Sequence, residues 1–297
     1  MSTNKKTVFE GAAVAIVTPF TNDKLDYGQL GKIIDFQIDN GTDAIVVCGT
    51  TGESSTLTDE EHVEAIAYTV DKVAKRVPVI AGAGSNDTRY AVWLSREARR
   101  AGADALLQVT PYYNKATPKG LIKHFMTIAD ATDIPNILYN VPSRTGCNIT
   151  LPVYKELAKH PNIVATKEAS GNLSAIAQIA DECGDDLDIY SGNDDQIVPI
   201  LSLGGKGVIS VLSNVMPKET HDICSLYFEG KVNESAALQK KLLELINNLF
   251  IEVNPIPVKT AMHLMGFCSE EMRLPLCEME DKNLQILKRS LEKYSLI

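Results

Sequence analysis

The sequence contains no long hydrophobic run. None of its apolar stretches approaches the roughly 18 residues that a membrane-spanning helix requires, so no association with a membrane is expected. Residues 1–10 are polar and lack the apolar core of a secretion signal. No Cys-x-x-Cys pair occurs among the six cysteines, which are scattered at positions 48, 147, 183, 224, 268 and 277. We therefore expect reduced thiols and a cytoplasmic protein.

Basic charge is also scarce. The chain has 29 lysine and arginine residues against 38 aspartate and glutamate residues, which gives a formal net charge of −9. This balance argues against nonspecific binding to nucleic acid or to anionic membranes, although small anions respond to local fields. The five histidines show no spacing typical of metal ligands. We therefore expect chemistry that uses neither a metal nor a cofactor.

The dominant pattern is an alternation of short apolar, β-rich runs with amphipathic helical segments. The apolar runs are Ala13–Val17, Ala44–Cys48, Pro78–Ala81, Ala105–Val109, Asn136–Tyr139, Ile163–Thr166, Leu187–Tyr190 and Gly207–Ser210. The helical segments are Tyr27–Asn40, Asp59–Arg76, Thr88–Ala101, Pro118–Ala131, Leu151–His160, Leu173–Cys183, Gln196–Leu203 and Pro217–Phe228. Because the runs are continuously apolar, both faces of each strand should be buried, as in parallel sheets. Eight such units in about 230 residues predict an α/β fold of the (β/α)8 TIM-barrel type.

A doubly wound sheet is the alternative fold. Its first βα turn should carry Gly-x-Gly-x-x-Gly, and no such motif follows any of the expected strands. The glycine-rich segment 204–207 precedes its strand, so we interpret it as a tight turn into the eighth strand rather than a phosphate-binding loop. The barrel is therefore the favoured prediction.

Beyond Gly230 the apolar strands stop. Helical patterns cover residues 231–252, Val258–Met265 and Met279–Tyr294, and the proline-rich segment Asn254–Pro257 separates the first two. We therefore expect a barrel over residues 1–229 and a C-terminal helical region over residues 230–297, packed on the barrel as an appendage.

One lysine stands at the end of a buried strand, where Ile163–Thr166 leads directly into Lys167. Lysine is seldom fully buried without a partner, and a low-dielectric pocket lowers the pKa of its amine. A neutral amine is a nucleophile that condenses with a ketone or aldehyde to give a Schiff base. The alternative interpretation is that Lys167 leaves the strand end for solvent and pairs with Glu168.

Other strand ends carry polar groups, and barrel enzymes place their chemistry at these ends. Thr50 and Thr51 follow the second strand between glycines, so they can bind an anion together with backbone N–H groups or belong to the cap of the next helix. Tyr139 ends the fifth strand, and Arg144 follows it. An arginine there suits a carboxylate, or else it orders its own loop.

Two further strand ends have simpler interpretations. Tyr112 and Tyr113 follow the fourth strand, where paired tyrosines favour packing or an interface. Gly192 follows the seventh strand and allows a substrate to approach the backbone, while Asp194 and Asp195 are expected to cap the next helix. Taken together, the strand ends favour carbonyl chemistry through a Schiff base, on a substrate that bears a carboxylate.

Several long motifs resemble those of the dihydrodipicolinate synthase/N-acetylneuraminate lyase family of class I aldolases. They occur in the family's order over nearly the whole chain, as Val17–Phe20, Gly49–Glu53, Val109–Asn114, Tyr139–Thr145, Thr166–Glu168 and Asn254–Lys259. Within the family, Thr50–Thr51 and Arg144 resemble the synthases, because the lyases usually have Ser-Thr at the first position and lack the arginine. The resemblance implies condensation of pyruvate with L-aspartate 4-semialdehyde to 4-hydroxy-tetrahydrodipicolinate, in lysine and diaminopimelate biosynthesis.

The resemblance also implies the catalytic roles. Lys167 forms the Schiff base with pyruvate, and Tyr139 relays protons through hydrogen bonds with Thr51 and Tyr113. Tyr113 reaches into the site of a neighbouring subunit, so the implied assembly is a homotetramer built as a dimer of dimers.

The implied substrate contacts come from four strand ends. The backbone around Thr50 and Thr51 holds the pyruvate carboxylate, Arg144 binds the carboxylate of the semialdehyde, and Gly192 and Ile209 line the pocket through backbone carbonyls. A sister lyase acting on a 2-keto-3-deoxy sugar acid, and a keto-acid sensor without turnover, are the alternatives. Arg144 is the residue that distinguishes the synthase from the sister lyase, and the presence of Lys167 and Tyr139 argues against the sensor.

The resemblance finally bears on regulation. Lysine-inhibited relatives bind L-lysine at the dimer interface, through residues that match Ser54, Ser55, His62, Asn86 and Tyr112. Two further positions differ, because Asp59 stands where the sensitive enzymes carry a histidine and Tyr90 where they carry a glutamate that pairs with an amino group of lysine. We therefore expect weak or absent inhibition by L-lysine.

Overall fold

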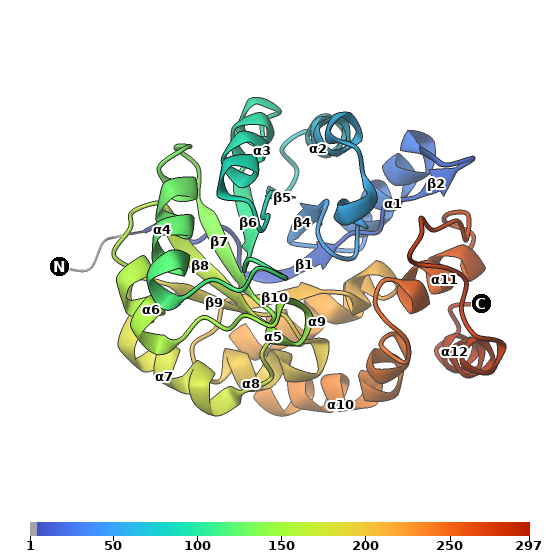
Figure 1. Ribbon diagram of the computed structural model, residues 1–297. Coiled ribbons are helices and arrows are strands. Elements are labelled where there is room, and N and C mark those ends of the chain that lie inside the picture. Colours follow the sequence, from blue (N-terminus) through green and yellow to red (C-terminus); the bar gives the residue numbers. More distant parts are fainter. Residues whose placement is uncertain (1–4) are drawn as a thin grey trace.

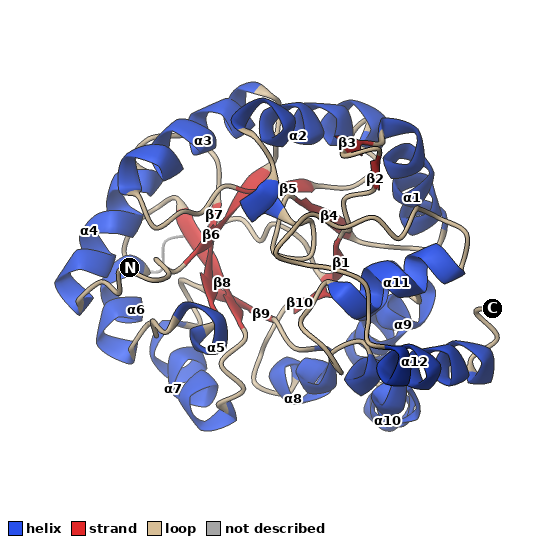
Figure 2. Cartoon of the chain, turned by 45° about the vertical axis from the view of Figure 1, so that its right-hand side comes forward, coloured by secondary structure: helices blue, strands red, loops and turns tan. Residues whose placement is uncertain are grey.

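Eight parallel strands close into a barrel in the computed structural model, which describes residues 5–297 (Figures 1 and 2). Around the barrel the order is β1-β10-β9-β8-β7-β6-β5-β4, and β1 closes the ring by pairing with both β10 and β4. The strands are β1 Gly11–Ala15, β4 Ala44–Val47, β5 Val79–Gly82, β6 Ala105–Val109, β7 Asn136–Asn140, β8 Ile163–Glu168, β9 Asp188–Ser191 and β10 Gly207–Ser210. The predicted (β/α)8 barrel is confirmed.

Helices follow the strands and surround the barrel as an outer ring (Figure 2). They are α1 Tyr27–Asp39, α2 Asp59–Val73, α3 Thr88–Arg100, α4 Pro118–Ala129, α6 Leu151–Leu157, α7 Leu173–Cys183, α8 Ile197–Leu201 and α9 Pro217–Phe228. Capping residues at the N-terminus fix the start of several of these helices. Thr58 and Glu61 form a capping box at α2, and the side chain of Asp26 accepts from the backbone of Gln29 at the start of α1.

The strands are buried on both faces, as their continuous apolar runs predict. One set of side chains fills the barrel interior, and it includes Ala15, Val46, Leu107, Tyr139 and Ile209. The alternate side chains pack outward against the ring of helices. The polar groups of an active site therefore have to come from the ends of the strands and the loops that follow.

The C-terminal region forms three helices, α10 Val232–Asn248, α11 Ile256–Leu264 and α12 Asp281–Lys293. Its apolar residues belong to the same core cluster as residues of β1, α1 and α9. Figure 1 shows α11 and α12 in red on the right, below the blue α1 and β2 and away from the end marked N. Within residues 5–297, no helix has the length and apolar character needed to cross a membrane.

Several details differ from the sequence-based expectation. The first strand begins at Gly11 and ends at Ala15, two residues earlier than expected at each end, because Gly11 pairs with Gly207 of β10. That pairing needs glycine, since a Cβ on Gly207 would lie 1.8 Å from the carbonyl oxygen of Gly11. The predicted tight turn before the eighth strand is confirmed, with Gly204 at φ +89°.

Two short elements were not expected from the sequence. The first is a hairpin of β2 Phe20–Thr21 and β3 Lys24–Leu25, whose turn residues Asn22 and Asp23 have φ of 54° and 59°. Asn and Asp tolerate this left-handed conformation, so the Asn22-Asp23 dipeptide was the sequence signal that could have predicted the hairpin turn. The second is the single-turn helix α5, Pro142–Thr145, which begins at a proline.

Candidate active site

Lys167 is the second-to-last residue of strand β8, and its side chain lies inside the barrel mouth. It is only 6% exposed, and its Nζ lies 4.4 Å from the centroid of the Tyr139 ring on the neighbouring strand β7. Because side chains alternate along a strand, its neighbours point outward: Thr166 Oγ1 lies 3.1 Å from the hydroxyl of Tyr154 on α6. An irregular register between Asn136 and Ile137 precedes this stretch of the β7–β8 pair.

Glu168 faces away from Lys167. Its carboxylate accepts hydrogen bonds from Nδ2 of Asn140 at 2.8 Å, from the hydroxyl of Tyr154 at 2.5 Å and from Oγ of Ser170 at 2.7 Å. Glu168 is itself buried, so these donors replace the water that it gives up. The interpretation in which Lys167 reaches solvent and pairs with Glu168 is therefore wrong.

The surroundings of Lys167 favour its neutral form. Burial lowers the pKa of the amine to about 8, the negative charge of Asp194 opposes that shift, and the Arg144 guanidinium adds to it. Among residues 5–297, no carboxylate forms a salt bridge with this lysine. A buried amine with a depressed pKa at a cavity is the group that Schiff-base chemistry needs.

Tyr139 remains protonated beside this amine. Burial raises the pKa of its phenol, while the Arg144 charge and the Thr50 hydroxyl oppose the shift. The neighbouring Thr51 hydroxyl accepts a hydrogen bond at 3.0 Å from Nδ2 of Asn254, which lies between α10 and α11. The relay from Tyr139 through Thr51 to Tyr113 thus stays a prediction, and Asn254 is a partner that the sequence did not reveal.

The Thr50–Thr51 segment is a compact loop rather than a helix cap. Its backbone turns on itself, with the amide of Gly52 donating to Gly49 and the amide of Glu53 donating to Thr50, both at 3.1 Å. Helix α2 is capped by Thr58 instead, so the alternative in which Thr50 and Thr51 cap the next helix is wrong. The loop leaves both threonines on the wall of the cavity that contains Lys167.

Arg144 projects from the short helix α5 at the rim of the same cavity. Its guanidinium donates one hydrogen bond, from Nη2 to the carbonyl oxygen of Asn254 at 3.2 Å. The remaining N–H groups of a guanidinium can take a carboxylate in a bidentate pair. Asn254 therefore contacts two predicted carboxylate-binding elements, Thr51 through its side chain and Arg144 through its backbone.

In the loop after β9, Asp194 and Asp195 do not cap the next helix as the sequence predicted. Asp194 does not cap helix α8; its Oδ2 accepts from the amides of Val211 and Leu212 at 3.0 and 2.9 Å and joins this loop to the end of β10. Asp195 does not cap that helix either. Asp194 is buried and its Oδ1 has no hydrogen-bond partner. Burial raises the pKa of this carboxyl group.

The cavity at the barrel mouth brings most of the predicted site residues together. Its wall contains Gly49, Thr50, Thr51, Tyr139, Arg144, Lys167, Gly192 and Asn193, together with Phe250 and Asn254 from the C-terminal region. Gly192 is needed there, since a Cβ would lie 2.7 Å from that of Ala169. Ile209 packs in the barrel interior, and the cavity is lined by Val211, the residue that follows the same strand.

Tyr113 does not line the cavity within this chain. Its ring is 91% exposed, and its backbone has a φ of 69°, so the side chain projects from the loop after β6. Tyr112 is also exposed, and its carbonyl oxygen accepts from Nδ2 of Asn86 at 3.1 Å. Two exposed tyrosines fit the interface interpretation of this pair.

A second cavity lies beside the first and shares Thr50, Val141 and Arg144 with it. Its wall also contains Ser54, Ser55, His62, Tyr90 and Tyr112. The Tyr90 hydroxyl donates to Oδ1 of Asp59 at 2.6 Å, so these two residues, which differ from the lysine-sensitive pattern, bind each other. His62 Nε2 lies 2.8 Å from the carbonyl oxygen of Gly82.

Neither cavity has the ligands of a metal site. Among the residues that the structure describes, no group of three or more histidine, cysteine, aspartate or glutamate side chains is placed to hold a metal ion. The six cysteines are free, and only Cys277 is exposed. The functional groups of the site are an amine, a phenol, hydroxyls, a guanidinium and backbone groups.

Comparison with known proteins agrees with this geometry. The model of the dihydrodipicolinate synthetase family matches residues 8–294. A Clostridium perfringens protein named 4-hydroxy-tetrahydrodipicolinate synthase is 59% identical over 290 residues, which cover 98% of this chain and all of that protein.

Two solved structures have the same fold. Dihydrodipicolinate synthase from Aquifex aeolicus is 47% identical, with a TM-score of 0.95 over 97% of this chain and 99% of that one. The chloride-inhibited dihydrodipicolinate synthase from Acinetobacter baumannii, complexed with pyruvate, is 41% identical, with a TM-score of 0.96 over 98% of this chain and 100% of that one. The chain therefore belongs to the dihydrodipicolinate synthetase family.

Proposed function

We propose that this enzyme condenses pyruvate with L-aspartate 4-semialdehyde to give 4-hydroxy-tetrahydrodipicolinate, in lysine and diaminopimelate biosynthesis. The observation that carries the proposal is the buried Lys167 amine, whose pKa of about 8 places a nucleophile at the wall of a cavity that also holds Arg144. The names of the relatives from Clostridium perfringens and Aquifex aeolicus support the substrate pair.

The reaction begins at the lysine. The neutral Lys167 amine attacks the ketone carbon of pyruvate, water leaves, and a protonated imine forms. The imine is an electron sink, so loss of a methyl proton gives an enamine. The enamine carbon then attacks the aldehyde carbon of the second substrate and forms the new C–C bond. The amino group of that substrate finally displaces Lys167, which closes the ring and returns the free amine.

The other site residues take the proposed supporting roles. The Thr50–Thr51 loop binds the pyruvate carboxylate. The carbonyls of Gly192 and Ile209 face the bound substrate, Gly192 from the cavity wall and Ile209 from strand β10, two residues before Val211 of that wall. Tyr139 holds a proton and passes it along a relay with Thr51, because its raised pKa keeps the phenol protonated at neutral pH. Arg144 binds the carboxylate of the semialdehyde.

We propose that the barrel, residues 1–229, and the helical region, residues 230–297, act as one catalytic unit in a cytoplasmic homotetramer. Phe250 and Asn254 support this view, because both lie in the helical region and line the cavity. The exposed ring of Tyr113 supports a dimer in which it completes the relay in the partner's site. Two such dimers would form the tetramer.

The second cavity is the proposed L-lysine site, with weak or absent inhibition. Asp59 could attract an ammonium group, but its carboxylate already accepts from Tyr90. Losing a charge-assisted hydrogen bond costs about 1.5–3 kcal/mol, or roughly 10- to 150-fold in affinity. Because a site that binds near 1 mM has only about 4 kcal/mol of binding energy, that loss would move binding beyond millimolar lysine.

The test is covalent trapping. The enzyme is incubated with pyruvate, reduced with borohydride and mapped by mass spectrometry, and turnover is then followed with L-aspartate 4-semialdehyde in a coupled assay. We expect one adduct, on Lys167, and loss of nearly all turnover in a folded Lys167→Ala variant. No adduct, or an adduct on another lysine, would reject the assignment of the nucleophile. Trapping without turnover of the semialdehyde would reject the second substrate alone.

A further inference from the structure

A buried ion pair lies directly behind the Thr50–Thr51 loop. Nζ of Lys259, on helix α11, lies 2.5 Å from Oε1 of Glu53, and both side chains are completely buried. The same Nζ lies 4.2 Å from the centroid of the Phe20 ring. Two charged groups that are far apart in the sequence are thus buried together. Glu53 directly follows Gly52, the glycine that closes the loop.

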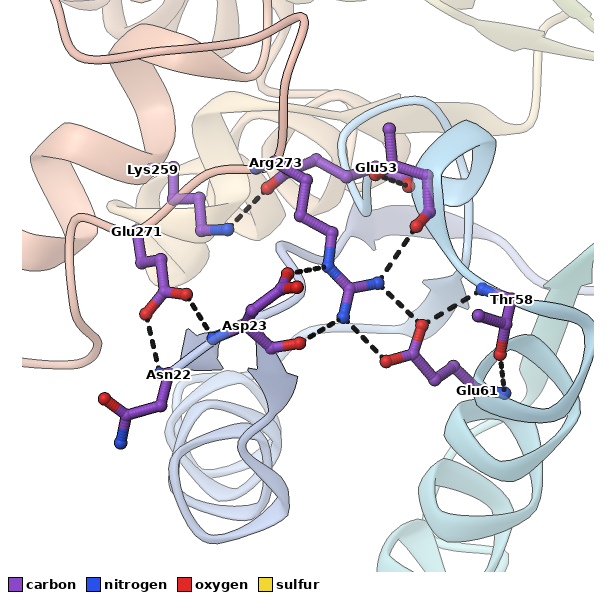
Figure 3. Close-up of polar contacts among 9 residues, drawn as sticks. Asn22, Asp23, Glu53, Thr58, Glu61, Lys259, Glu271 and Arg273 are labelled. Atoms are coloured by element: carbon purple, nitrogen blue, oxygen red, sulfur yellow. Dashed lines mark hydrogen bonds and ion pairs between the residues drawn. The ribbon is translucent and has the colours of Figure 1, made fainter.

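A wider network of contacts surrounds the carboxylate of Glu53 (Figure 3). Its second oxygen, Oε2, accepts from the backbone amide of Arg273 at 3.3 Å. The Arg273 guanidinium binds both carboxylate oxygens of Glu61, at 2.6 and 2.7 Å, and Oδ1 of Asp23 at 2.9 Å. Glu53 is therefore held by residues from two parts of the C-terminal region, α11 and the segment before α12.

The backbone of Glu53 belongs to the loop itself. Its φ of 52° is left-handed, a conformation that a residue with a Cβ adopts at a cost, and its amide donates to the carbonyl oxygen of Thr50 at 3.1 Å. On the other side of the loop, Asn254 donates to Thr51. The segment that begins at Asn254 and includes Lys259 thus holds the loop at two points.

Stability alone does not account for such a pair. Removing two charges from water costs free energy that their attraction often fails to recover, and well-packed apolar residues can replace a buried pair without loss of stability. The pair restricts the position of the Glu53 side chain, because its carboxylate accepts from two fixed donors, Lys259 and the Arg273 amide. A fixed side chain in turn restricts the Glu53 backbone, and with it the positions of the Thr50 carbonyl and the following amides.

We propose that the Glu53–Lys259 ion pair is a positioning device of the active site, which sets the Thr50–Thr51 backbone and thereby the affinity for the carboxylate of pyruvate. Neither residue lines the cavity, so neither touches the substrate. The inference rests on the proposed function, in which this loop holds that carboxylate. It extends the site to a pair of residues that act only through the loop.

Two variants test the inference. Glu53→Asp keeps the charge and tolerates a left-handed backbone, but it withdraws the carboxylate by one C–C bond, about 1.5 Å. The double variant Glu53→Gln/Lys259→Met removes both charges while keeping the volumes. Asp23→Asn is the matched control, because it removes an exposed ion pair of the same Arg273 network without contacting the loop. Melting temperatures are recorded for all of them.

Pyruvate affinity is measured as the concentration dependence of borohydride trapping on Lys167, and semialdehyde KM is measured in the coupled assay. For both variants we expect pyruvate affinity to fall by at least about tenfold while semialdehyde KM stays within about twofold, since small misplacements of a positioned group have large effects. The Asp23→Asn control should retain both values.

Two results would overturn the inference. One is pyruvate affinity within about twofold of the parent enzyme in Glu53→Asp, which shows that the position of the carboxylate is irrelevant to the loop. The other is an equal loss for both substrates, which shows general loosening. If the double variant does not fold, Glu53→Asp decides alone. Failure of the parent enzyme to trap pyruvate would instead reject the proposed function.

Discussion

The rate at which Lys167 forms its imine should depend steeply on pH near 8. Burial lowers the pKa of this amine to about 8, and the neutral form is the nucleophile. At pH 7, about one Lys167 amine in eleven is then neutral, against about one in 2,500 for an ordinary lysine with a pKa near 10.4. The environment thus supplies roughly a 200-fold larger population of nucleophile at neutral pH.

The sign of the dependence follows from the direction of the shift. The charged amine predominates below pH 8, so the rate should rise about tenfold for each pH unit up to that value and level off above it. Removing Arg144 takes away a positive charge that lowers this pKa, so Arg144→Gln should move the midpoint to higher pH. Asp194 opposes the shift, so Asp194→Asn should move the midpoint to lower pH.

The assay is the initial rate of reductive trapping with pyruvate and cyanoborohydride from pH 6 to pH 10, with the adduct quantified on the Lys167 peptide. The three enzymes are compared at one ionic strength, because exposed charges are screened by salt. A midpoint near 10 in the parent enzyme would refute the argument from burial. A midpoint that moves to lower pH in Arg144→Gln would refute the assigned sign of the Arg144 effect.

Three further predictions concern single residues. Arg144→Ala should raise the semialdehyde KM, or lower kcat/KM, far more than it weakens pyruvate trapping at pH 9, because an unpaired carboxylate costs on the order of 2–5 kcal/mol; equal losses would make Arg144 structural. Mixing Lys167→Ala with Tyr113→Phe under subunit exchange should restore activity, since one site per mixed dimer receives a native lysine and a native tyrosine. No recovery despite proven exchange would contradict the action of Tyr113 in the partner's site. Titration with L-lysine near pH 8, with pyruvate near KM, should give no half-inhibition below about 1 mM, and Tyr90→Glu should increase sensitivity.

The parts of the structure that were predictable are those with local causes. Continuously apolar runs identified all eight barrel strands, because strands buried on both faces need apolar residues at every position. The place of Lys167 at the end of β8 followed from the same run. Lys167, Tyr139, Arg144 and the Thr50–Thr51 loop then meet at one cavity, because the C-terminal ends of parallel strands share one end of a barrel.

The missed contacts join residues that are distant in the sequence. Thr51 and Asn254 are 203 positions apart, and Glu53 and Lys259 are 206 apart, so no local periodicity records either contact. A signal for the second was present, since Lys259 stands in the apolar stretch 256–262 and needs a partner if that helix is buried. The sequence contains too many carboxylates to identify which one.

The prediction for Asp194 was wrong for a different reason: the preference of aspartate for helix caps predicted a local contact, but a tertiary contact formed instead. An aspartate just before a helix usually caps it, but here the carboxylate turns to the amides of Val211 and Leu212 at the end of the neighbouring strand β10. Both donors come from one turn that lies beside the β9 loop in the barrel. Only the closed order of strands places that turn within reach.

The contrast between two buried lysines explains which of them can act as the nucleophile. Burial lowers the pKa of both amines, but Lys259 has the Glu53 carboxylate at 2.5 Å and lines no part of the cavity. Around Lys167, side-chain donors bind the Glu168 carboxylate, two amides bind only the Oδ2 oxygen of Asp194, and neither carboxylate forms a salt bridge with the amine. The Lys167 amine therefore loses its proton without a direct counterion to retain it, on the wall of the cavity that a carbonyl substrate can enter.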